Sequence, residues 1–117
     1  MSIEINGVLG DDHIDTERLI LKVVEDDNLT NYAVVDSQST MFGRVPKKDR
    51  HIFWFPSREV KKGDTVVLYT KRGKPGFLDK DETRHVFYWN LDKGIWTSKN
   101  DSAILIRIMS WVSKKVI

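Results

Sequence analysis

Two extended segments and the turn between them occupy residues 51–70, HIFWFPSREVKKGDTVVLYT. The flanks His51–Phe55 and Thr65–Thr70 are rich in aromatic and β-branched residues, a composition that favours strands. Pro56 cannot donate a hydrogen bond to a strand ladder, and Lys62-Gly63-Asp64 has the composition of a turn. The stretch therefore predicts one strand that ends at Pro56 and a second that begins after the turn.

The same composition recurs along the chain, whereas no window keeps apolar residues at helical spacing long enough to predict a helix. We expect further strands at Ser2–Asn6, Glu17–Val24, Tyr32–Asp36, His85–Trp89 and Ala103–Met109, with a last short one near Trp111–Ile117. Brief strands separated by polar turns are typical of a β-sandwich or barrel. The length of 117 residues suits one domain, which we place at residues 1–117.

The composition excludes several classes of protein. The chain contains no cysteine, so disulfides, thiolate metal sites and thiol chemistry are absent. Residues 1–7 have no signal-peptide character, and no apolar run approaches the length of about 20 residues that a spanning helix needs. These features predict a cytoplasmic protein. The net charge of +2 is too balanced to indicate a nucleic-acid binder by itself.

The order of motifs resembles the lamin tail domain family. Residues 51–70 are similar to its central signature, a strand that ends in Phe-Pro, a link with an apolar residue (Val60), a Lys-Gly turn and an apolar strand. Tyr32–Asp36 resembles the early strand of the family. Trp96, followed by Asn100–Leu105, resembles its late element, although Asn31 and Asn100 stand where glycine is usual.

The resemblance implies an all-β fold, an antiparallel immunoglobulin-like sandwich of about seven to eight strands. It also implies a stand-alone, bacterial-type member, because we find no coiled coil, enzyme domain or export signal beside the domain. Members of this family serve as interaction modules. A fold-level likeness does not name the partner.

No residue pattern indicates catalysis, and we predict a protein that is not an enzyme and needs no cofactor or metal. His13 with Asp11, Asp12 and Asp15 is the sole local cluster of histidine and carboxylates, and its spacing does not match a calcium-binding loop. Ser57 and His51 have no nucleophile-elbow motif around them. A solvated loop and a polar strand end explain these residues.

Two aromatic residues are candidates for an exposed binding site. Alternation along each strand directs Trp54 away from Phe53 and Phe55, and Tyr88 away from its neighbours Phe87 and Trp89. An exposed aromatic ring can anchor a protein interface or stack on a base, but packing beneath loops or lysine stems is the alternative.

Three strands also carry apolar residues on both faces: Leu19–Leu21, Val66–Leu68 and Ile104–Ile106. Loops can cover the second face, or that face can meet another protein or a second copy. The function that we predict is therefore an interaction module that binds a protein or self-associates through a sheet face or edge.

Basic residues gather in the middle of the chain and support an alternative. Residues 43–76 hold ten basic and three acidic residues, whereas residues 1–27 hold two basic and eight acidic ones. The ten are Arg44, Lys47, Lys48, Arg50, Arg58, Lys61, Lys62, Lys71, Arg72 and Lys74. If their loops converge, they form a rim for nucleic acid or another polyanion; a solvated surface is the plain explanation. A carbohydrate or small-ligand module is a second alternative without a specific motif.

Overall fold

The computed structural model describes residues 1–10, 13–38, 51–79, 83–96 and 101–116. Within them the chain is nearly all β, which confirms the predicted fold class at that level. The strands are β1 (Ile3–Leu9), β2 (Arg18–Val23), β3 (Asp27–Asn28), β4 (Tyr32–Gln38), β5 (Ile52–Trp54), β6 (Glu59–Val60), β7 (Thr65–Tyr69), β8 (Gly76–Asp79), β9 (Thr83–Tyr88) and β10 (Asp101–Arg107). A single 3₁₀ turn at Leu29–Asn31 completes the described elements.

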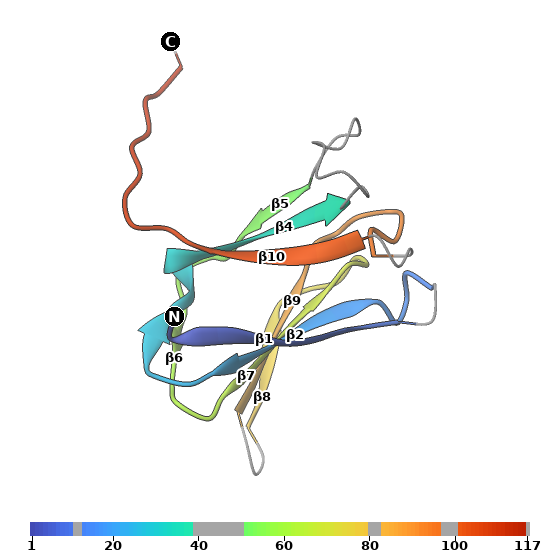
Figure 1. Cartoon of the computed structure of the whole chain (residues 1–117), viewed down its shortest axis with the longest axis horizontal. Coiled ribbons are helices and arrows are strands. Elements are labelled where there is room, and N and C mark those ends of the chain that lie inside the picture. The colour runs from blue at the N-terminus through green and yellow to red at the C-terminus, as the bar shows by residue number, and fades with distance from the viewer. Residues whose placement is uncertain (11–12, 39–50, 80–82, 97–100, 117) are drawn as a thin grey trace.

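The strands form two main sheets that lie in separate layers (Figure 1). The larger sheet has the order β1-β2-β7-β9-β8 and the smaller one the order β10-β4-β5, while β3 and β6 form a two-stranded ribbon at one end. All pairs are antiparallel except β7 with β9, which run parallel. The expectation of a wholly antiparallel arrangement is therefore wrong at that pair, because β8, rather than β9, follows β7 along the chain and fills the edge.

The core lies between the two sheets. The larger sheet contributes Leu19, Leu21, Val66, Leu68 and Phe87 to it, and all five are fully buried. Each of these alternates with a residue that faces outward, as the pleat of a strand requires. The smaller sheet and its continuations close the core from the other side with Tyr32, Val34, Phe55 and Val60.

The turn at residues 61–64 has the geometry that its composition predicts. Gly63 has a φ of 95°, a region that residues with a Cβ avoid. Its amide donates to the carbonyl of Val23, and the Lys61 amide is held by the Asp64 carboxylate at 2.9 Å. The turn therefore fixes the start of β7 against the end of β2.

The sequence prediction misplaced some elements. Each of the seven main predicted strands overlaps an observed one. The sequence missed β3 and β6, which have two residues each, and β8, which begins at Gly76 directly after a stretch rich in glycine and proline. The strand expected near Trp111–Ile117 is absent from the described part of that segment, since residues 108–116 form no strand and lie largely exposed.

Candidate interaction surface

The outer face of the smaller sheet is apolar across all three of its strands. Register places Ile104, Val35 and Ile52 in one row. The next row consists of Ile106, Ala33 and Trp54, and antiparallel partners point to the same side of a sheet. We call these six residues the Trp54 face.

The edges of the Trp54 face are open to solvent. Ile52 is 66% exposed, Trp54 44%, Ile104 42% and Ile106 41%. The central Val35 and Ala33 are buried beneath them. The next row along the sheet is Ser37 beside Ser102, so none of the eight residues in these three rows carries a charge. A contiguous exposed apolar patch on one sheet face is a common mark of an interaction site.

Trp54 is held in a defined orientation on this face. Its indole Nε1 donates to the carbonyl of Thr30 at 2.7 Å, and its ring meets Trp111 edge-to-face with 5.1 Å between centroids. Trp54, one of the two candidates for an exposed aromatic residue, is thus partly exposed and partly packed on Trp111. An aromatic residue fixed in this way has already lost much of its rotamer freedom, which lowers the entropic cost of binding through it.

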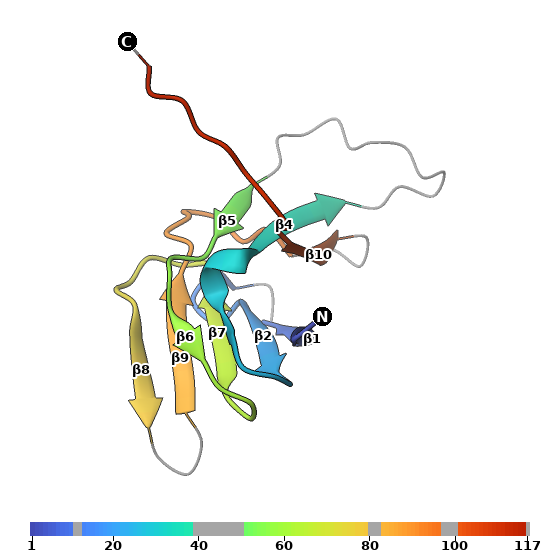
Figure 2. The same ribbon diagram turned by 90° about the vertical axis from the view of Figure 1, so that its left-hand side faces the viewer.

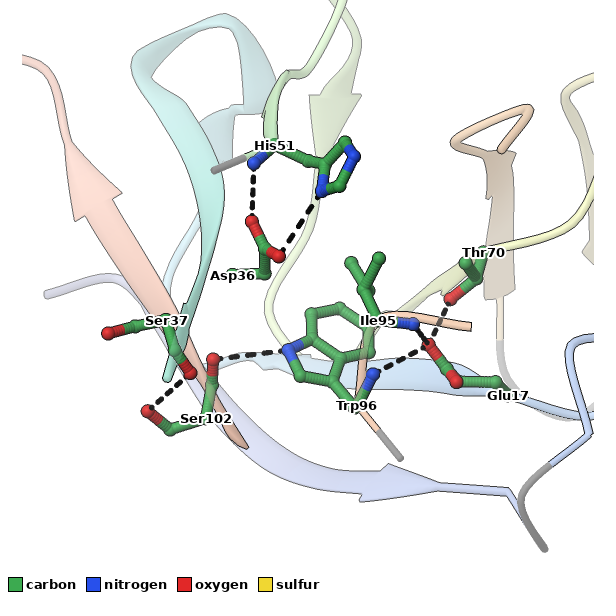
Figure 3. A network of polar contacts seen from close by, with 8 residues as sticks. All are labelled: Glu17, Asp36, Ser37, His51, Thr70, Ile95, Trp96 and Ser102. Atoms are coloured by element: carbon green, nitrogen blue, oxygen red, sulfur yellow. Dashed lines mark hydrogen bonds and ion pairs between the residues drawn. The ribbon is translucent and has the colours of Figure 1, made fainter. Parts of the chain in front are cut away.

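A buried carboxylate ties the smaller sheet to the larger one (Figure 3). Glu17, which directly precedes β2, is 2% exposed, and its Oε1 accepts hydrogen bonds from the Thr70 hydroxyl and the Ile95 and Trp96 amides at 2.8–3.1 Å. The indole of Trp96 in turn donates to the carbonyl of Ser102 in β10 at 3.1 Å. Trp96 packs against the core and links the two layers.

Figure 3 also shows the contact between Asp36 in β4 and His51, the residue directly before β5. The Asp36 carboxylate accepts from the backbone amide of His51 and lies 3.2 Å from its Nδ1. The imidazole ring packs edge-to-face on Trp89. The hydroxyl of Ser57 bonds to Asn28 rather than to a histidine. The contacts of His51 with Asp36 and Trp89 therefore hold the chain directly before β5, the strand that carries Ile52 and Trp54.

A second carboxylate, that of the half-buried Asp27, holds the chain at the start of β4. The Tyr32 hydroxyl donates to Asp27 Oδ2 at 2.8 Å, and the Asn28 amide and Asn31 side chain donate to Oδ1. Burial raises the pKa of Asp27, but these hydrogen bonds outweigh burial, so the pKa lies below the ordinary value of 3.8. Burial, together with the Asp27 charge, raises the pKa of Tyr32 above 10.0.

The second aromatic candidate, Tyr88, has a more covered position. Its ring stacks on Tyr69 with 5.4 Å between centroids, and it lies so close to Gly73 that a Cβ there would approach the ring to 2.4 Å. Tyr88 is half-buried on the outer face of the larger sheet. It therefore lies on the opposite layer from Trp54, and the two do not form a common site.

The described basic candidates divide between the two ends of β7. Lys61 and Lys62 precede the strand, while Lys71, Arg72 and Lys74 follow it (Figure 2). Arg58 is half-buried, donates to the Gly76 carbonyl at 3.0 Å and lies over the Phe87 ring. Arg44, Lys47, Lys48 and Arg50 lie outside the described residues.

Several of these cations already have partners. Arg72 bonds to Asp92 through two nitrogens at 2.7 and 3.0 Å, Lys61 lies 3.7 Å from Asp26, and Lys71 lies over the Tyr69 ring. Lys62 and Lys74 are exposed. Their role in binding a polyanion remains a prediction.

The sequence missed most of the Trp54 face. Ile104 and Ile106 gave a signal, since Ile104-Leu105-Ile106 is apolar on both faces, but nothing in the sequence placed Ile52 beside them. That placement comes from β4, which lies between β5 and β10 and pairs with both. Within the described residues, no group of histidines and carboxylates could hold a metal ion, and no helix is long and apolar enough to cross a membrane.

Comparison with known proteins finds no family model, no curated protein and no solved structure that matches this chain.

Proposed function

We propose that this domain is a non-enzymatic interaction module that binds through the Trp54 face, and that its partner there is a second copy of the chain. The observation that carries the proposal is the pair of apolar rows, uncharged and open to solvent at both edges, on an ordered sheet. When a partner removes such aliphatic and aromatic side chains from water, the free energy falls by roughly 25 cal/mol for each Å² of apolar surface buried.

Charge favours a second copy over a partner of opposite charge at this surface. Two Trp54 faces can meet without burying a charged group, and an isologous dimer uses the same patch on both subunits. The outer face of the larger sheet carries Arg18, Lys22 and Arg84 against the carboxylate of Glu4, the cross-strand partner of Lys22, so two such faces would meet with an excess of positive charge. The smaller sheet is therefore the better surface for self-association.

The family and the finer fold type are also proposals. What supports an immunoglobulin-like sandwich of the lamin-tail kind is the arrangement of the central signature around the core. Phe55 is buried where β5 ends before Pro56, Val60 is buried at the end of the two layers, and Gly63 has the positive φ that its turn needs. An experimental structure with a different sheet order would contradict this proposal.

The test is a matched pair of substitutions on the two layers. Ile104→Lys places a charge on the Trp54 face, and Leu9→Lys places one on the larger sheet at a residue of similar exposure, 45% against 42%. Sedimentation equilibrium should show at least about tenfold weaker self-association for Ile104→Lys, since a charge is buried without a partner. Leu9→Lys should retain the wild-type constant.

Circular dichroism serves as the control that both variants are folded. Equal association of the two variants and the wild type would refute the Trp54 face as the contact surface. A wild-type chain that stays monomeric at every concentration would refute self-association through it.

A further inference from the structure

A cleft opens on the side of the molecule where both sheets end. β1 is the edge of the larger sheet and β10 the edge of the smaller one. The cleft between them is lined by Met1, Ile3, Glu4, Ile5 and Leu105. A neighbouring depression shares Met1 and adds Glu25 and Arg107. This side of the domain therefore combines apolar side chains, the carboxylates of Glu4 and Glu25, the guanidinium of Arg107 and a strand edge with no neighbouring strand in the described sheet. Glu4 is also the cross-strand partner of Lys22.

The segment that follows β10 has the complementary composition. We call residues 109–116, MSWVSKKV, the C-terminal segment. Its last backbone contact with the body is just before it, where the Ile108 amide donates to the Asn31 carbonyl at 2.7 Å. Val112 and Val116 are 94% and 90% exposed, and Lys114 and Lys115 lie between them. The segment is thus apolar, basic and extended, and it projects away from both sheets (Figures 1 and 2).

The contact of Trp111 directs the segment away from the cleft of its own chain. Trp111 packs on Trp54 in β5, and β5 is the edge of the smaller sheet opposite to β10. The chain must therefore cross the smaller sheet to the side remote from β1. Residues 112–116 then reach outward, where a second molecule can meet them.

We propose that the C-terminal segment of one copy adds to the β1 edge of a second copy, with its valines in the cleft and its lysines beside Glu4 and Glu25. The open edge offers backbone donors and acceptors to an added strand. Opposite charge fixes which surface receives the segment, and exchange of a terminal element between identical chains is a common route to dimers. The receiving cleft and the Trp54 face are different surfaces, although Trp111 at the start of the donated segment packs on Trp54. The inference therefore goes beyond the proposed function, and it is tested with variants at residues outside the Trp54 face.

Charge exchange tests the pairing directly in the full-length chain. One variant carries Lys114→Glu with Lys115→Glu, a second carries Glu4→Lys with Glu25→Lys, and a third carries all four changes. Sedimentation equilibrium at low salt should show at least about tenfold weaker association for each of the first two, because like charges then face each other. The third should return to within about threefold of the wild type, because opposite charges meet again.

A second pair of changes tests the apolar part without disturbing the fold. Val112→Asp and Val116→Asp alter side chains that contact almost nothing in their own chain, so the unfolding midpoint should not move while association weakens. A control for the charge reversals is Lys93→Glu, at an exposed position that belongs neither to the C-terminal segment nor to the residues that line the cleft, and it should leave association unchanged.

Three results would overturn this inference. They are wild-type association in the C-terminal segment variants, no recovery in the fourfold variant, and a spin label at residue 116 that broadens Ile5 resonances equally at all concentrations, which would place the segment in its own cleft. If Ile104→Lys weakens association while the segment variants do not, the inference fails and the Trp54 face stands. The reverse pattern refutes the proposed function and leaves the inference intact.

Discussion

The outer faces of the two sheets share a buried valine on the central strand but differ in the residues that flank it. Each has a central strand whose outward residue is nearly covered, Val67 at 5% exposure in the larger sheet and Val35 at 7% in the smaller one. Around Val67, the side chains of Arg18, Lys22, Arg84 and Tyr69 line a hollow in this face, so long polar side chains border its apolar row. Around Val35 stand aliphatic residues that are themselves exposed.

The difference shows that an apolar residue on the outer side of a strand does not by itself indicate a binding face. The cross-strand neighbours decide whether the row is closed by long polar side chains or is left open. In the larger sheet, long polar side chains border the second face. In the smaller sheet the corresponding neighbours are Ile52 and Ile104, which leave the apolar row exposed at both edges, and this is the surface that we propose a second copy covers.

The largest expected effect concerns the link between the two layers. Glu17→Ala removes the acceptor for the Thr70 hydroxyl and for two backbone amides in a buried site. We expect the free energy of unfolding to fall by about 3 kcal/mol, because buried donors are left without partners. Urea denaturation measures the loss. A fall below about 1 kcal/mol would mean that the layers are held together mainly by apolar packing.

The next effect separates the two outer faces most sharply. Val67→Lys must bury an ammonium group or expose the strand around it, and should lower the free energy of unfolding by about 2 kcal/mol or more. Ile104→Lys keeps its head in water and should change that free energy by less than about 0.5 kcal/mol. Thermal and urea unfolding of both variants provide the comparison. Equal losses would show that the two faces do not differ in closure.

The smallest expected effect concerns the hydrogen bond between Tyr32, at the start of β4, and Asp27, and it depends on pH. The folded-state pKa of Asp27 lies below its ordinary value of 3.8, so its contribution is present above that pH and is lost as pH falls through the folded pKa. The pKa of Tyr32 is raised, so its contribution is present below pH 10.0 and is lost as pH rises through the folded value.

Tyr32→Phe removes one hydrogen bond to Asp27 and should lower the free energy of unfolding at neutral pH by about 1 kcal/mol. The variant should lose less stability than the wild type on acidification, because its Asp27 pKa is less depressed. Above pH 10 the variant should also lose less free energy of unfolding, because it lacks the phenol whose pKa is raised in the folded state. Urea unfolding curves across the pH range measure the free energy of unfolding of both proteins at acidic and alkaline pH. If that free energy changes with pH in the same way for the variant and the wild type, the Asp27–Tyr32 contact is contradicted.

The sequence predicted the all-β class and the seven main strands because each lies in a run of apolar, aromatic or β-branched residues bounded by polar turns. It could not predict β3, β6 or β8, which are set by their partners rather than by any local pattern. It identified Trp54 by alternation along one strand. It could not assemble the Trp54 face, because that surface depends on the order β10-β4-β5, in which segments distant in sequence become neighbours.

In the C-terminal segment, the sequence predicted a strand that the structure does not contain in the described residues. Its apolar residues predicted a strand near Trp111–Ile117, yet residues 108–116 form none. A strand needs a partner edge, and in its own chain the contact of Trp111 with Trp54 leads the segment away from β10. Strand-like composition without a partner edge therefore did not produce a strand in residues 108–116.

A concentration series of methyl and indole NMR spectra tests the central claim most directly. If the smaller sheet carries the open face, the methyl signals of Ile52, Ile104 and Ile106 and the Trp54 indole should shift as the protein is concentrated. The methyl signals of Val67 and Val86 in the larger sheet should stay in place. Shifts confined to the larger sheet, or none on the Trp54 face at any concentration, would contradict the account.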